Sequence, residues 1–384
     1  MKYDVTGVIT SSLLFLNVIS AAFNPSTDSI FTAVNSWLND RANAEATYGH
    51  ISSWNTSGID DMSELFRGAT SFNDDISSWD MSSVTKVASM FMGASTFNQP
   101  INTWNISSLV NNMGYMFENA VSFNQPLSSW SVSSVTNMDS MFKGANSFNQ
   151  NISGWDVSSV TSMEGLFMDA TSFNMPIGEW DLSSVITTRR MFSGASSFNQ
   201  GLNGWDVTSV TNMEGMFMNA RAFNQPLSAW DVSLVTNMEN IFYGATSFNQ
   251  NIDGWDISKL ANTQNMFSEA SSFNYCLNSW LERLNSECNG QCENVCLYIC
   301  QSCYSSNPTA SPTQQVRTSP RASASSGSGV DEMFVGVVVA ACIFSVFVVC
   351  GTMGYIHVTE KYYQVHIEDD DDLGEQRNFE MPDA

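Results

Sequence analysis

The sequence is poor in basic residues and in histidine. It has 14 Lys and Arg residues against 38 Asp and Glu residues, which gives a formal net charge of −24. This balance argues against a nucleic-acid partner, because phosphate contacts need clustered Lys and Arg. The only histidines are His50, His357 and His366, so there are few groups for a His-based metal site or for acid-base chemistry. We expect no enzymatic activity and no cofactor.

Charged residues are also scarce, at 14% of the chain, whereas 43% of the residues are hydrophobic and 12% are aromatic. Disordered chains have the opposite profile, with high charge and little hydrophobicity. Most of the chain is therefore expected to fold.

The two ends of the chain carry apolar segments. Val8–Ile19 follows Lys2 and precedes the small residues Ser20–Ala22, which predicts a secretory signal peptide over residues 1–22. The alternative is a buried N-terminal strand or helix. Residues 333–356 contain no charge over 24 positions and are long enough to cross a bilayer as a helix. The alternative there is a helix of a protein core.

Signal peptide and span together predict a single-pass type I protein of the cell membrane with its N-terminus outside. Residues 305–332 are rich in Ser, Thr, Pro, Ala and Gly, which predicts an extended stalk. Residues 357–384 form an acidic tail on the cytoplasmic side.

Tryptophan recurs every 25 residues through the middle of the chain, with one step of 26 where Leu109 follows the Ser pair. The tryptophans are Trp54, Trp79, Trp104, Trp130, Trp155, Trp180, Trp205, Trp230, Trp255 and Trp280. Such a period indicates a solenoid. We predict nine units over residues 54–279, preceded by an N-terminal cap over residues 23–53.

Within one unit, Met213, Met216, Phe217 and Ala220 have the spacing of one apolar helical face. Thr211 with Glu214 matches a capping box, which predicts a helix of about two turns. Two residues after each such Phe stands a residue that is Gly or Asn in seven of nine units, as expected where a helix ends. Apolar and polar residues alternate around each Trp, which predicts a short strand with Trp and Val pointing inward.

The predicted fold class is therefore α/β: a right-handed solenoid of the leucine-rich-repeat type, with a short parallel strand and a short helix in each unit. A β-helix without α-helices is the alternative. Every unit also contains Phe followed by Asn, from Phe72 and Asn73 to Phe273 and Asn274. We expect the Phe column in the core and the Asn column to pair with backbone groups of neighbouring units.

The repeated pattern MFxGAxSFNQxIxxWDVSSVTNM resembles the BspA-like leucine-rich-repeat surface proteins, whose repeat is also widespread in mycoplasma surface proteins. The resemblance covers about residues 28–280. It implies surface display and, for some members, adhesion or protein binding, and it brings no catalytic residue. The chain differs from the mycoplasma members in its predicted membrane span, which stands in place of an N-terminal lipid anchor.

Six cysteines lie at the end of the last complete unit or after it, where an open solenoid must cover its apolar end. They are Cys276, Cys288, Cys292, Cys296, Cys300 and Cys303. An even number in an exported segment predicts a disulfide-linked cap over residues 280–304, with the pairing left open. A zinc site is the alternative, although the spacing lacks the usual short Cys pairs.

An aspartate directly follows Trp in most units. The members are Asp80, Asp156, Asp181, Asp206, Asp231 and Asp256. We expect a solvated outward row that hydrogen-bonds to nearby Ser and backbone groups, with calcium bridging as the alternative. Asn55, Asn105 and Asn151 begin glycosylation sequons.

Positions that are identical between units are expected to serve packing, so recognition should depend on variable exposed positions. Candidates near the predicted helix ends are Lys143, Arg189, Arg190, Met218, Arg221 and Tyr243. The sequence thus predicts a surface glycoprotein that recognises an extracellular protein or glycan. A receptor or co-receptor that signals through partners of the tail is an alternative, and a carbohydrate-active enzyme is a weaker one, because no Asp is distinguished from the others as acid or base.

Overall fold

The computed structural model describes residues 22–275 apart from Ser107, together with Leu277, Ser279 and Trp280. These residues lie in one compact unit of the chain, Met1–Ser311. The signal peptide apart from its last residue, all eight cysteines, the stalk, the predicted span and the tail lie outside the described residues. Within the described part, no helix is long and apolar enough to cross a membrane.

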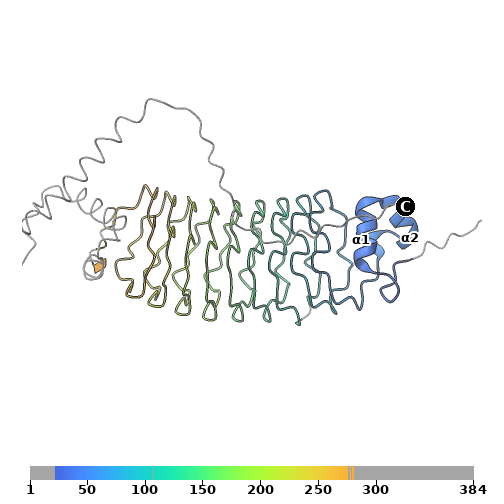
Figure 1. The fold of residues 1–384 in the computed structure, drawn as a ribbon, viewed down its shortest axis with the longest axis horizontal. Coiled ribbons are helices and arrows are strands. Elements are labelled where there is room, and N and C mark those ends of the chain that lie inside the picture. Colours follow the sequence, from blue (N-terminus) through green and yellow to red (C-terminus); the bar gives the residue numbers. More distant parts are fainter. Residues whose placement is uncertain (1–21, 107, 276, 278, 281–384) are drawn as a thin grey trace, which may run out of the picture. The chain divides into compact units, whose positions relative to one another are not determined.

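Three helices precede the repeats: α1 (Ile30–Asn39), α2 (Arg41–Tyr48) and the 3-10 helix η1 (Ile51–Ser53). Helix α1 buries the face that carries Ile30, Ala33, Val34 and Trp37. Both α-helices lie at the end of the stack that holds the first repeat (Figure 1).

Side chains of both helices bind the first repeat. The ring of Trp37 packs edge-on against Trp54, 5.9 Å between centroids, and its indole N–H donates to Asp74. Arg41 of α2 pairs with the same carboxylate at 2.8 Å. The helices therefore close one end of the apolar interior.

The nine repeats form nine coils that stack side by side along one axis (Figure 1). Coils 1 to 9 are residues 54–78, 79–103, 104–129, 130–154, 155–179, 180–204, 205–229, 230–254 and 255–279. Neighbouring coils are joined by isolated parallel bridges, such as Asn212 with Asn237. The predicted stacking of one coil on the next in register is confirmed.

The predicted helix is wrong. Residues 213–220 form successive turns instead, and alternate N–H groups leave the coil to bind its neighbour. Four N–H groups of coil 7 donate to carbonyl oxygens of coil 8 at 2.6–2.9 Å, in the pairs Met213 to Asn237, Gly215 to Glu239, Phe217 to Ile241 and Asn219 to Tyr243. The N–H groups between them, such as that of Met216, donate three residues back within the turn. We call residues 211–220, and the same stretch of every coil, the ladder segment.

Left-handed backbone at two places in each ladder segment explains why no helix forms. In coil 7 these are Gly215 at φ 58° and Asn219 at φ 57°. A helix cannot continue through such residues. The predicted capping box is also wrong, because both the N–H and the hydroxyl of Thr236 donate to the carbonyl of Thr211, at 2.9 and 3.2 Å. These threonines therefore extend the pairing between coils.

The predicted strand at Trp is wrong as well, because Trp205–Val207 are irregular backbone between two turns, but the inward direction of Trp and Val is confirmed. Trp205 and Val207 are buried, and the indole N–H of Trp205 donates to the carbonyl of Ile177 at 2.9 Å. The same bond, at 2.8–3.2 Å, recurs in the eight tryptophans from Trp79 to Trp255. Each Trp thus ties its own coil to the preceding ones.

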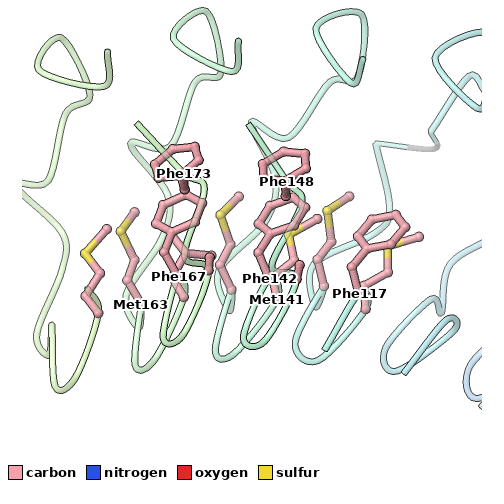
Figure 2. Close-up of a cluster of buried hydrophobic side chains, with 14 of the residues drawn as sticks. Phe117, Met141, Phe142, Phe148, Met163, Phe167 and Phe173 are labelled. Atoms are coloured by element: carbon pink, nitrogen blue, oxygen red, sulfur yellow. The ribbon is translucent and has the colours of Figure 1, made fainter. Parts of the chain in front are cut away.

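Phenylalanine fills the interior in two parallel columns (Figure 2). In the first column, which contains Phe142 and Phe167, neighbouring ring centroids lie 5.4–5.8 Å apart with nearly parallel planes. The second column contains Phe148 and Phe173, and within one coil the two rings are 3.9–4.2 Å apart. Methionines such as Met141 and Met163 line the same interior. The Phe column predicted for the core is confirmed.

The asparagine column pairs with backbone groups, as predicted. The side-chain oxygen of Asn199 accepts from the backbone N–H of Asn224 at 2.9 Å and from the side chain of Gln225 at 3.1 Å. The backbone bond recurs in every step from Asn73 to Asn274. This column satisfies N–H groups that the bend in each coil turns toward the neighbouring coil.

Candidate recognition face

The exposed side chains of the ladder segments make up one face, which we call the ladder face. Its positions differ from coil to coil, whereas the Trp, Phe and Asn columns repeat. Five of the six predicted binding residues lie in ladder segments: Lys143, Arg189, Arg190, Met218 and Tyr243. Arg221 directly follows the ladder segment of coil 7 and is exposed.

The structure brings Arg190 and Met218 together on either side of Gly215. A Cβ atom at Gly215 would lie 3.2 Å from Cγ of Arg190 and 3.7 Å from Cβ of Met218. Glycine therefore leaves room for the stem of the arginine of the preceding coil. Tyr243 lies one coil further along the stack, where its hydroxyl donates to Glu269 at 2.5 Å.

Both arginines of coil 6 pair with glutamates of neighbouring coils. Arg189 contacts Glu164 of coil 5 at 2.5 Å and Glu214 of coil 7 at 3.2 Å. Arg190 contacts the same Glu214 at 3.3 Å. The guanidinium groups thus bridge three coils, so this part of the face combines positive and negative charge.

Lys143 also pairs within the ladder face, with Glu118 of the preceding coil at 3.3 Å. The side chain of Glu118 is only 7% exposed, and among the described residues its second oxygen has no hydrogen-bond partner. Lys143 therefore compensates a buried carboxylate, and its replacement would leave that charge unpaired.

Coil 6 differs from coils 5, 7 and 8 at five consecutive positions, a stretch that also varies in coil 2 (TKVAS, residues 85–89) and in coil 9 (ANTQN, residues 261–265). Residues 186–190 read ITTRR, whereas the same stretch reads TSMEG in coil 5, TNMEG in coil 7 and TNMEN in coil 8. Ile186 takes the place of a threonine and is 49% exposed. Sequence reasoning missed Ile186, Thr187 and Thr188, although an alignment of the repeats shows that they differ from the same positions of the neighbouring coils.

Arg190 stands at a place that has left-handed backbone in all nine coils. Its φ is 53°, and only coils 5 and 7 have glycine there, as Gly165 and Gly215. A non-glycine residue there costs about 1–2 kcal/mol. Tyr115 of coil 3 shares this conformation, at φ 60°, and is 44% exposed. Bulky exposed side chains held at such positions point to a function other than packing.

Thr188 offers a test of whether coil 6 packs less well than its neighbours. It is fully buried in the place of a methionine, and its hydroxyl contacts the sulfur of Met216 at 3.4 Å. We expect Thr188→Met to raise the free energy of unfolding by about 1–2 kcal/mol, because it buries more apolar surface. Urea denaturation would measure this change. A destabilised variant would show that coil 6 lacks the space that its neighbours provide for methionine.

The aspartates after Trp are exposed and hydrogen-bond locally. Asp156 accepts from the backbone N–H of Ser158 at 3.2 Å and from its hydroxyl at 2.6 Å. Asn55 makes the same pair of bonds with Ser57, so a carboxylate is not required. Within residues 22–280, as far as described, no three His, Cys, Asp or Glu side chains lie close enough to hold a metal ion. Calcium bridging remains a prediction that these contacts do not test.

The serine hydroxyls, and then the serine backbone N–H groups, lower the pKa of these carboxyls. The effect holds for Asp80, Asp156, Asp181 and Asp231. Because the folded pKa lies below the unfolded one, the stabilisation is complete above the unfolded value and is lost as the pH falls through the folded value. We expect NMR titration of these carboxyl groups to give midpoints below about 3.9, the ordinary aspartate pKa. Midpoints at or above that value would contradict the local bonds.

The three sequon asparagines, Asn55, Asn105 and Asn151, are exposed. Each belongs to a different coil, and their side chains point away from the apolar columns. The six cysteines of the predicted cap lie outside the described residues, so their pairing stays a prediction.

Comparison with known proteins identifies the repeat. The model of the family described as "Mycoplasma protein of unknown function, DUF285" matches three overlapping segments, residues 36–143, 125–210 and 198–295. No curated protein matches the chain. The three segments cover more than half of the sequence and include every coil. The chain therefore belongs to the DUF285 family of repeat proteins.

Proposed function

We propose that this protein is a single-pass cell-surface glycoprotein whose ladder face recognises an extracellular protein or glycan, with its centre at coils 5–7. Membership of a repeat family supports a repeat-containing surface protein. Export is supported by the predicted signal peptide, by the sequons and by the resemblance to BspA-like proteins. Anchoring in the membrane is supported by the apolar segment at 333–356. These features are the reason for proposing a surface protein with a single span.

The observation that carries the proposal is the departure of coil 6 from the repeat. Its five unusual residues include an exposed Ile186 and a conformationally costly Arg190 beside Met218. Arginine and methionine are enriched in protein interfaces, and exposed aliphatic side chains add apolar contact area. The arginines also pair with Glu164 and Glu214 of the neighbouring coils, so the exposed Ile186 is the replacement for which the described residues provide no packing role.

The test restores coil 6 to the repeat. The combined variant Ile186→Thr, Thr187→Asn, Thr188→Met, Arg189→Glu and Arg190→Gly copies residues 211–215 of coil 7, so we expect it to fold. Proximity labelling from the outer side of intact cells would first name the neighbours of the protein. We then expect the variant to bind the identified neighbour at least about tenfold more weakly than the natural chain, in a purified binding assay.

A matched control changes the same coil away from the ladder face. Asp181→Ser with Ser184→Lys introduces the residues that coils 4 and 9 carry there, Ser131 and Lys259, and should leave binding unchanged. Charge reversal at Arg189, Arg190 and Arg221 is a second arm. Unchanged binding in both the coil 6 variant and the charge-reversal variant would show that this patch is the wrong one.

A further inference from the structure

The methionines of the repeats fall into two groups that differ in exposure. Most of those in the described part of the chain are buried in the interior, with exposed fractions of 0–2%, like the labelled ones in Figure 2. Met92, Met168 and Met218 directly follow the Phe of the first column and are partly exposed on the ladder face, and Met175 is partly exposed elsewhere. A thioether at the surface is open to oxidation to a sulfoxide, whereas a buried thioether is protected.

Coil 7 contains methionines of both kinds. Met216 is fully buried, and the hydroxyl of Thr188 contacts its sulfur at 3.4 Å. Met218 folds back over Gly215, because a Cβ atom at this glycine would lie 3.7 Å from Cβ of Met218 and 4.0 Å from its sulfur. The sulfur of Met218 therefore lies against the backbone of the ladder segment, in a side chain that is partly exposed.

The side chain of Arg190 packs at the same glycine. The Cβ position built on Gly215 is 3.2 Å from Cγ of Arg190, so the thioether and the stem of the arginine are neighbours. The guanidinium of Arg190 contacts Oε1 of Glu214 at 3.3 Å, and the guanidinium of Arg189 contacts the same oxygen at 3.2 Å. Because two guanidinium groups share one carboxylate oxygen, a new acceptor beside Arg190 would compete with Glu214 for its N–H groups.

We propose that Met218 is a site of reversible oxidation that switches recognition at the ladder face, an inference that rests on the proposed function. The oxidant is hydrogen peroxide. The sulfur forms a bond to one peroxide oxygen, the O–O bond breaks, and the leaving hydroxide takes the proton of the transferred oxygen, so that the peroxide is reduced to water and the thioether is oxidised to a sulfoxide. The sulfoxide oxygen is a stronger acceptor than the thioether, and it draws the guanidinium of Arg190 away from Glu214.

Met168 of coil 5 is the control that the repeat itself provides, because it lies beside Gly165 in the same way but next to a serine. A Cβ atom at Gly165 would lie 3.8 Å from Cβ of Met168 and 3.1 Å from the hydroxyl oxygen of Ser140. The preceding coil thus presents a serine where Met218 meets Arg190. We expect oxidation of Met168 to leave the ion pairs of coil 6 unchanged.

Two measurements on the full-length chain in detergent test this proposal without a ligand. With limiting hydrogen peroxide, peptide mapping by mass spectrometry should show oxygen added to Met218 and Met168 at least about tenfold faster than to Met216. By NMR, the side-chain N–H signals of Arg190 should shift on oxidation and return after treatment with methionine sulfoxide reductases, while those of Arg41 on α2 stay in place. Peroxide should no longer move the Arg190 signals in Met218→Leu, whereas in Met168→Leu it still should.

Binding to the neighbour identified by proximity labelling separates this inference from the proposed function. Peroxide should weaken the binding of the natural chain and of Met168→Leu about fivefold or more, and it should not change the binding of Met218→Leu, whatever the starting affinity of that variant. Equal binding before and after oxidation, with binding lost in the coil 6 variant, would overturn the switch and leave the proposed function intact.

Two other results would overturn the inference whatever the partner is. Oxidation of Met216 as fast as Met218 would show that burial does not select the site. Arg190 signals that stay in place when Met218 is oxidised would show that the sulfoxide does not reach the guanidinium. Unchanged binding in the coil 6 variant would instead overturn the proposed function, and the Arg190 signals would still decide whether Met218 controls the arginine.

Discussion

Replacing Phe167 by alanine is expected to lower the free energy of unfolding by about 3–5 kcal/mol. Phe167 is fully buried in the central coil, with Phe173 at 3.9 Å in the same coil and Phe142 and Phe192 each at 5.8 Å in the coils on either side. The cavity would therefore interrupt the aromatic column in both directions. In a solenoid, stability depends on contacts between neighbouring units, so a break at the centre weakens two of them.

Urea denaturation, followed by the fluorescence of the stacked tryptophans, measures this loss. Phe31→Ala is the matched control, because Phe31 is 44% exposed on α1 and its removal should cost no more than about 0.5 kcal/mol. Equal losses in the two variants would contradict a continuous core.

Asn199→Leu is expected to lower the free energy of unfolding by about 1–3 kcal/mol. Leucine has a similar size but no side-chain acceptor, so the backbone N–H of Asn224 would lose its partner, and the Gln225 side chain would keep only the backbone carbonyl of residue 199. Asn199→Asp keeps an oxygen in place and is the control. If leucine and aspartate lowered the free energy of unfolding equally, the Asn column would stabilise the protein through side-chain volume and not through hydrogen bonds.

The sequence was sufficient to predict the columns but not the backbone that carries them. Met213, Met216, Phe217 and Ala220 have inward spacing in a helix, and they have it equally in a series of turns with left-handed residues every fourth position. Apolar periodicity alone does not separate the two. Gly165 and Gly215 were a usable signal, because glycine in the middle of a two-turn helix is unfavourable.

For the candidate site, the sequence predicted which charged residues lie on the ladder face, but the ion pairs between them were missed. Arg189 was a reasonable candidate because it is a variable charged residue. Its partners Glu164 and Glu214 stand 25 residues before and after it, one coil in each direction, so the repeat length itself contains this information. The burial of Glu118 beneath Lys143 depends on how side chains pack across coils, which no spacing reveals.

The packing columns and the variable surface are thus separated within each coil. The Trp, Phe and Asn columns hold neighbouring coils at a fixed distance and leave the ladder face free to vary, as residues 186–190 do. Because the bonds of the ladder are made by backbone groups, most of its exposed side chains can change without loss of pairing. The second left-handed position of each segment is the exception, since it is Gly or Asn in seven of the nine coils.

The central claim, that N–H groups of one ladder segment bind the next coil, can be measured directly through scalar couplings across hydrogen bonds in a deuterated sample. We predict a coupling between the backbone nitrogen of Gly215 and the carbonyl carbon of Glu239, and likewise between Phe217 and Ile241. A coupling from Gly215 to Thr211, four residues earlier in the same coil, would indicate a helix and would contradict both the ladder and the face built on it.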